Sequence, residues 1–162
     1  MRKKVKQKMP PKKISIAIQN VSGQRIPSHE FLKSAVFAVL NDKIDAFSLC
    51  IRIVDQVESA SLNYQYRKKE GSTNVLAFPS HEILADNAIL LGDIVVCASV
   101  VKQEAKQQQK TFHAHFAHMI VHGCLHLLGF DHQTDKEEYE MQAVEIQSLK
   151  RIGLANPYQG SL

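Results

Sequence analysis

The sequence lacks any hydrophobic run that approaches the roughly 18 residues of a membrane-spanning helix. Its basic N-terminus is not followed by an apolar stretch, so the pattern of a secretory signal is absent as well. Repeats and low-complexity segments are also missing from the body of the chain. With 162 residues, 44% of them hydrophobic and 22% charged, the composition is that of one ordinary globular domain. We expect a cytoplasmic protein that does not associate with a membrane.

Cysteine is scarce, and no two cysteines lie close together in the sequence. The chain has three, Cys50, Cys97 and Cys124, each isolated within an apolar stretch. An odd count without a CxxC pair argues against both a disulfide framework and a cysteine zinc site. Cys124 lies inside the histidine motif described below, but on another face of the predicted helix. We predict that it is a small buried hydrophobic residue.

Acidic residues are absent from the first 13 positions, where seven of the 20 basic residues lie. From Ile14 onward, 13 basic residues stand against 16 acidic ones, so the basic character belongs to a segment and not to the whole body. We expect residues 1–13 to form a basic flexible tail and residues 14–155 a single domain. Such a tail either docks on RNA phosphates by releasing counterions or is a disordered, solubilising arm, and the sequence leaves both open.

Hydrophobic periodicity predicts a domain of mixed strands and helices. Alternating or short apolar runs predict four strands, at residues 14–19, 47–54, 75–78 and 91–98. Helical periodicity and capping residues predict five helices, at residues 28–40, 57–66, 99–110, 111–128 and 135–151. We therefore expect an α/β (α+β) fold, a small mixed sheet of about four strands packed with about five helices, with a metal site at a helix end.

Several finer features are predicted from single residues. Pro79 ends the third strand, which suits an edge strand, and residues 80–90 form a loop. Asp135 begins a capping box for the last helix, and the chain after Asn156 frays. The side chains of the last helix that face inward are predicted to be Tyr139, Ala143, Ile146 and Leu149.

Three histidines in the fourth predicted helix and the turn after it have metal-ligand spacing. His122 and His126 are four residues apart, so they share one face of the helix. Gly129 can adopt positive φ and end the helix, so His132 can turn back toward the other two. Two ligands from a helix and one from the next turn leave one position of a tetrahedral metal free, as in catalytic zinc sites. We predict one Zn²⁺ ion there, although nickel and copper also accept nitrogen ligands.

The spacing is that of the metzincin peptidase motif, H-E-x-x-H-x-x-G-x-x-H, with one departure. Gly123 stands where that motif has its general-base glutamate. A peptidase without this carboxylate lacks the group that takes the proton from the water on the metal. The sequence therefore contains the three metal-binding histidines of the motif but lacks its catalytic glutamate.

Four other residues in or near the motif are weaker candidates. His118 lies one helical turn before His122, and it either supports a ligand, lines the pocket or is a core histidine. Asp131 either orients a ligand or, as we favour, caps the turn after the helix. His113 and His115 have no such support, and we predict both at the surface.

The run from His122 to His132, HGCLHLLGFDH, resembles the signature of the YbeY family of bacterial zinc-dependent endoribonucleases, which also carries glycine in the second position. A second similar segment, Leu62 to Pro79, contains Arg67 and the string TNVLAFP. The resemblance implies that Arg67 acts in catalysis beside the metal. A guanidinium suits this task because it grips a phosphate through two hydrogen bonds and offsets the charge that grows as the phosphodiester is attacked. From composition alone, Arg67 is a surface residue at a helix end.

The same resemblance implies a substrate and partners. It predicts a single-strand-specific endoribonuclease that acts in maturation of the 3′ end of small-subunit (16S) ribosomal RNA and in ribosome quality control. Contacts with the small ribosomal subunit and its proteins are implied too. The segment around Asp93 also matches the family, which makes Asp93 a candidate structural residue or a support for a ligand.

Two other functions remain open from the sequence. The metzincin-like spacing is compatible with a zinc metallohydrolase that cleaves a peptide or a small ester. The basic segment and the acidic body are compatible with a non-catalytic RNA- or ribosome-binding module that holds a structural zinc, although the free coordination position argues against it.

Overall fold

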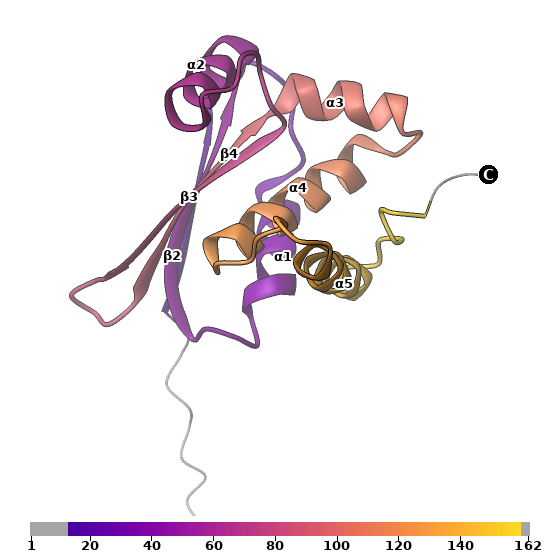
Figure 1. The fold of residues 1–162 in the computed structure, drawn as a ribbon. Coiled ribbons are helices and arrows are strands. Elements are labelled where there is room, and N and C mark those ends of the chain that lie inside the picture. Colours follow the sequence, from indigo (N-terminus) through magenta and orange to yellow (C-terminus); the bar gives the residue numbers. More distant parts are fainter. Residues whose placement is uncertain (1–12, 160–162) are drawn as a thin grey trace, which may run out of the picture.

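The computed structural model describes residues 13–159, which form a four-stranded mixed sheet and five α-helices (Figure 1). The predicted α/β fold is confirmed. In chain order the elements are β1 (Lys13–Asn20), α1 (His29–Leu40), β2 (Ala46–Val54), α2 (Gln56–Arg67), β3 (Val75–Ile83), β4 (Ile89–Cys97), α3 (Ala98–Gln107), α4 (Phe112–Leu127) and α5 (Asp135–Arg151).

The basic tail predicted over residues 1–13 falls almost wholly outside the described residues. Of this segment only Lys13 is described, and it is the first residue of β1. No helix within residues 13–159 is long and apolar enough to cross a lipid bilayer.

The sheet consists of three parallel strands and one antiparallel edge strand. The strand order is β1-β2-β4-β3, in which β1, β2 and β4 are parallel and β3 pairs antiparallel with β4. Alternate side chains of the inner strand β2 belong to the main core and are at most 1% exposed; they are Phe47, Leu49, Ile51 and Ile53. The period of two predicted for this strand is therefore confirmed.

The two faces of the sheet bury cores of unequal size. On one face lie α1 and α4, and α5 packs against both of these helices (Figure 1). On the other face a small cluster forms where Leu62 of α2 packs against Val54, Leu76 and Val95. Helix α2 is thereby held against β3 and β4, so its C-terminal end lies beside the edge of the sheet.

Helix α4 lies at the centre of the domain. Its N-cap is Thr111, whose Oγ1 accepts a 3.0 Å hydrogen bond from the backbone N–H of Ala114. The helix ends before Gly129, which has the expected positive φ, 97°. Most of its 16 residues are buried because it contacts β3, β4, α1, α3 and α5. The end of α4 is therefore a rigid support for side chains.

Gly123 sets how closely α4 approaches the sheet. A Cβ atom at this position would lie 2.8 Å from Cγ2 of Ile94, a fully buried residue of β4. Such a contact is too short for two carbon atoms, so a side chain here would push the helix away from the sheet. The glycine that stands in place of the peptidase glutamate is therefore required by packing.

The third strand is longer than predicted. It continues through Pro79 to Ile83, and its last residues pair with the start of β4, so the predicted loop over residues 80–90 is wrong except at its tip. Pro79 is tolerated because β3 is an edge strand and the pairing shifts register between Pro79 and Glu82. His81 lies in this bulge with φ of 61°.

The N-cap of α5 is one residue earlier than predicted. Oγ1 of Thr134, not the carboxylate of Asp135, accepts a 3.1 Å hydrogen bond from the backbone N–H of Glu137. The Glu137 carboxylate in turn accepts a 3.1 Å hydrogen bond from the backbone N–H of Gln133. A capping arrangement is present, but the threonine begins it.

The buried face of α5 also differs from the prediction. Tyr139 is 76% exposed and Ala143 is exposed, whereas Ile146 is half-buried and Leu149 is buried. The buried residues of this helix are Met141, Glu145, Ser148 and Leu149. The prediction assigned only apolar residues to the buried face. It was wrong because Glu145, a charged residue, is buried and makes its hydrogen bonds inside the domain.

The chain after α5 is anchored on the domain. The Tyr158 hydroxyl donates a 2.5 Å hydrogen bond to Glu145, and Nζ of Lys110 donates one of 2.5 Å to the carbonyl of Pro157. The predicted fraying after Asn156 is therefore wrong for the residues described.

We expect Gly123→Ala to lower the free energy of unfolding by about 1–2 kcal/mol. Overpacking costs about 1–3 kcal/mol, and the better helix propensity of alanine offsets at most about 1 kcal/mol. Urea unfolding followed by circular dichroism measures the difference. In an Ile94→Ala background, which removes the atoms that the new methyl group would meet, the same change should be neutral or stabilising. An equal loss in both backgrounds would contradict the contact.

Candidate metal centre

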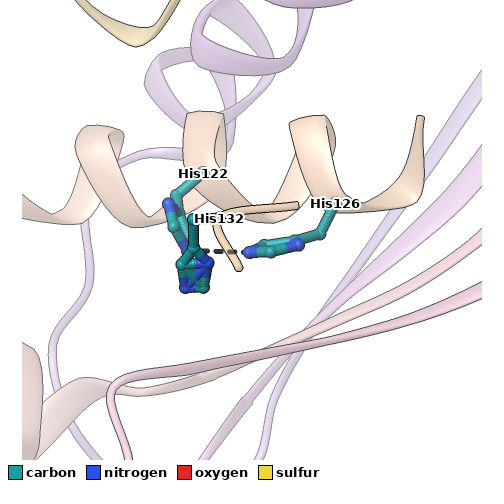
Figure 2. Close-up of side chains that lie close together, drawn as sticks. All are labelled: His122, His126 and His132. Carbon is teal, nitrogen blue, oxygen red and sulfur yellow. Dashed lines mark hydrogen bonds between the residues drawn. The ribbon is translucent and has the colours of Figure 1, made fainter. Parts of the chain in front are cut away.

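The structure brings the three motif histidines together (Figure 2). His122 and His126 project from the C-terminal part of α4, and His132 approaches from the segment between α4 and α5. One ring nitrogen of each lies within 4.8 Å of the other two, and the Nε2 atoms of His122 and His126 are 3.0 Å apart. His132 is exposed while the other two are half-buried, so the cluster is open to solvent on that side.

A buried carboxylate selects the tautomer of His122. Nδ1 of His122 lies 2.9 Å from Oε1 of Glu145. An ionised carboxylate only accepts hydrogen bonds, so Nδ1 of His122 carries a proton, and Nε2, which faces His126, is the nitrogen that could bind a metal. Histidines that bind metals commonly donate their other N–H to a carboxylate in this way. The contact with Glu145 therefore orients the His122 ring as in such sites.

His126 is held in its neutral form. Burial lowers its pKa, and the neighbouring His122 and His132 lower it further, to about 4; the Phe130 backbone and Asp131 act in the opposite direction. The imidazole is therefore uncharged at neutral pH, which is the form that binds a metal ion. Three imidazole nitrogens beside a solvent-open position suit zinc better than magnesium or calcium, which prefer oxygen ligands.

Glu145 is a residue of the site that the sequence reasoning missed. Its side chain is 1% exposed; Oε1 accepts from His122, and Oε2 accepts from His118 and from the Tyr158 hydroxyl. Burial raises the pKa of Glu145, but the hydrogen bonds from His118 and His122 lower it more, and the net pKa falls to about 2. The carboxylate is therefore ionised, and its negative charge lies next to Nδ1 of the candidate ligand His122.

One signal in the sequence could have indicated this residue. Glu145 lies four residues after Met141 and four before Leu149, so a carboxylate stands in the middle of an apolar helix stripe. Tyr158 offers no such signal, because only the fold of the chain after α5 brings its hydroxyl to Glu145.

Two further motif residues lie beside the cluster without joining it. His118 is buried and hydrogen-bonded to Glu145, so it is one contact removed from His122. Asp131 accepts a 2.8 Å hydrogen bond from the backbone N–H of His132, and its Oδ1 also lies 3.9 Å from Nδ1 of that residue, so its capping and its ligand-orienting role both stay predictions.

His115 is not at the surface, as the sequence suggested, but 3% exposed. Its Nε2 lies 3.2 Å from Oε1 of Glu104, and burial lowers the pKa of His115 while Glu104 partly offsets that effect. Glu104 also accepts a 3.0 Å hydrogen bond from Asn74, the residue before β3. This contact connects the start of β3 to α3 and α4.

The remaining candidates lie away from the cluster or have no role in it. Asp93 is exposed on the sheet face opposite α4, so it does not support a ligand, and the prediction of that role is wrong. His113 is exposed, as predicted. Cys124 is fully buried, and burial raises the pKa of its thiol to about 12, so it is the inert hydrophobic residue that we expected.

A pocket of about 770 Å³ joins the histidine cluster to Arg67. Its walls are the end of α2, residues 74–79 at the start of β3, the histidine face of α4, and residues 129–133. Polar and apolar groups both line it. The pocket therefore brings together two sequence segments that resemble one family but lie more than 40 residues apart.

Arg67 is the last residue of α2 and is exposed. Within residues 13–159 its guanidinium has no hydrogen-bond or ion-pair partner. The helix ends there because Lys68 adopts a left-handed conformation with φ of 57°, and Nδ2 of Asn63 holds the following loop by a 2.9 Å hydrogen bond to the carbonyl of Gly71. The arginine is thus placed at the pocket with its donors available.

Fold and pocket together define a class of protein, an α/β domain in which three converging histidines share a solvent-open pocket with an unpaired arginine. A model of the family described as Endoribonuclease YbeY matches residues 15–153. The chain belongs to the YbeY family and is therefore an endoribonuclease, a hydrolase that acts on RNA. The resemblance seen in the sequence is confirmed.

The fold is also similar to a solved structure, the solution structure of TM1509 from Thermotoga maritima. The TM-score is 0.55 at 22% sequence identity, and the match covers 86% of this chain and 91% of that chain. At this identity the similarity supports the fold alone.

We expect Glu145→Gln to weaken zinc binding by about 10- to 100-fold, because His122 loses the charged acceptor that holds its Nδ1 proton. Competition with a chromophoric chelator measures the dissociation constant. Glu104→Gln is the matched control, since Glu104 also accepts a hydrogen bond from a histidine, but from His115, outside the cluster. It should bind zinc as the unmodified protein does. Equal weakening in both variants would contradict the role of Glu145.

Proposed function

We propose that this protein is a zinc-dependent endoribonuclease that cleaves single-stranded RNA, with one ion bound by His122, His126 and His132. The observation that supports this most is that the three histidines line the same pocket as the unpaired Arg67. In this proposal the metal and the phosphate-binding group act on one phosphodiester held in that pocket. The pocket is open on the side of the exposed His132, where a strand could enter.

The residues of the cluster fit zinc by their chemistry. His126 offers a neutral nitrogen, and the ionised Glu145 stabilises the tautomer of His122 that leaves its Nε2 for a metal. With three protein ligands, one coordination position stays free for water or substrate. When bound, such an ion lowers the pKa of a coordinated water and polarises a phosphoryl oxygen.

Arg67 is proposed as the catalytic residue that binds the scissile phosphate. Its guanidinium can donate two parallel hydrogen bonds to a phosphate, and its positive charge opposes the negative charge that grows on the phosphate during attack. Its position at the end of a helix held against the sheet limits how far it can move from the histidines.

The natural substrate is proposed to be the 3′ end of 16S ribosomal RNA, cleaved in the cytoplasm on or near the small ribosomal subunit, with a further role in ribosome quality control. Support for this comes from the family resemblance of the histidine motif and of the segment around Arg67. The seven basic residues within the first 13 positions would add affinity for RNA phosphates.

Packing at Gly123 argues against a peptidase of the metzincin type. A glutamate at that position would need room where Ile94 lies, 2.8 Å from the position of a Cβ atom. A glutamate base at that position would therefore overpack the contact between α4 and β4.

We expect Arg67→Gln to lower kcat/KM for a single-stranded oligoribonucleotide by about 100- to 1,000-fold, because a donor that stabilises the transition state is lost. Zinc content, measured by atomic spectroscopy, should be unchanged. Lys69→Gln is the matched control: Lys69 is a basic, exposed residue two positions on, but it does not line the pocket. His126→Ala should lose both zinc and cleavage.

Three outcomes would count against the proposal. Cleavage of an unfolded protein or an ester by the zinc-loaded protein, with RNA left intact, would indicate another hydrolase. A folded Arg67→Gln variant with full RNA cleavage would remove Arg67 from the mechanism. Full biological activity of that variant, together with unfolding of His126→Ala, would favour a non-catalytic module with a structural zinc.

A further inference from the structure

An exposed aromatic side chain stands next to Arg67 in the wall of the pocket. Tyr66 precedes Arg67 in the last turn of α2, and both residues line the pocket that contains the histidines. Tyr66 is 58% exposed, which is unusual for a large aromatic residue that also faces a pocket. The end of α2 therefore presents an aromatic ring and a guanidinium side by side to whatever occupies the pocket.

The ring of Tyr66 is supported from the side by Phe78 of β3. The two ring centroids are 5.0 Å apart with an angle of 67° between the planes, an edge-to-face contact. Phe78 is half-buried, packs against the small core under α2, and lines the same pocket. Such a contact holds the orientation of Tyr66 while most of its surface stays accessible.

A second tyrosine of α2 is equally exposed but neither lines the pocket nor contacts another ring of the described residues. Tyr64 is 61% exposed, almost as much as Tyr66, but it does not line the pocket, and no ring within residues 13–159 contacts it. The two tyrosines thus differ in position and in support, not in exposure.

The chemistry of the pair Tyr66 and Arg67 matches one repeating unit of a nucleic-acid strand, a flat base next to a charged phosphate. Proteins that bind single strands combine basic groups along the backbone with aromatic rings on which bases stack, and every base has a face that can stack. Bases inside a duplex are already stacked on their neighbours and are not available in this way.

Resting on the function proposed above, we propose that Tyr66, supported by Phe78, is a base-stacking subsite for one unpaired nucleobase of the RNA substrate, next to the phosphate bound by Arg67. The subsite selects single-stranded RNA because only an unpaired base can turn onto the ring. It acts in binding and positioning, with no proton transferred.

Binding of RNA without cleavage tests the subsite directly. The full-length protein, freed of metal with a chelator, is titrated against a fluorescein-labelled single-stranded oligoribonucleotide, and anisotropy gives the dissociation constant. Tyr66→Ala should weaken binding by about 5- to 150-fold, the range expected for one lost base–aromatic stack of about 1–3 kcal/mol. Tyr66→Phe should stay within about twofold, because the ring and not the hydroxyl makes the contact. Tyr64→Ala, the matched control, should bind as the unmodified protein does.

A set of oligoribonucleotides with a single abasic position assigns the contact to one base. The unmodified protein should lose affinity at one position near the cleavage site, and Tyr66→Ala should be insensitive to the loss of that same base. Equal affinities for Tyr66→Ala and Tyr64→Ala, with RNA still cleaved by the zinc-loaded protein, would overturn the subsite and leave the nuclease intact. Absence of both binding and cleavage in the unmodified protein would overturn the proposed function as well.

Discussion

The site depends on the hydrogen bonds that surround the Glu145 carboxylate. Burying a charge is costly unless hydrogen bonds and opposite partial charges compensate for it, and three donors from α4 and the C-terminal segment do so here. The same bonds connect α5 and Tyr158 to α4, and one of them sets the tautomer of His122. Glu145 therefore has two roles. It holds the last helix in place, and it accepts the hydrogen bond from Nδ1 of His122 that orients this candidate ligand.

A second constraint is the close approach of α4 to β4 at Gly123. The absence of a side chain lets the helix lie against Ile94, which places the histidine face of α4 opposite the start of β3. The residue type that permits this approach also lacks the carboxylate that the metzincin motif has at this position, so one residue affects both the packing of α4 and the groups available in the pocket.

The opposite wall of the pocket is held by contacts far from the histidines. Asn74 is bonded to Glu104 of α3, which also pairs with His115 of α4, and the loop after α2 is closed by Asn63. These buried and half-buried polar contacts hold β3 and the end of α2 in position relative to the histidine cluster. The backbone that carries Arg67 is therefore held at the pocket although its guanidinium is unpaired within residues 13–159, which suits the phosphate-binding role proposed for it.

Most elements, and the spacing of His122 and His126, could be predicted from the sequence, because both depend on neighbours within one or two helical turns. Prediction failed where a distant partner overrides the local pattern. Pro79 lies within a strand because β3 is an edge strand with a bulge. Tyr139 faces solvent because the face of α5 that contains Glu145 is the one that is buried. The sequence alone determined which residues can act as ligands and how far apart they stand along the chain. Only the tertiary structure decided which carboxylate supports them, because that choice depends on contacts between segments that are separate in sequence.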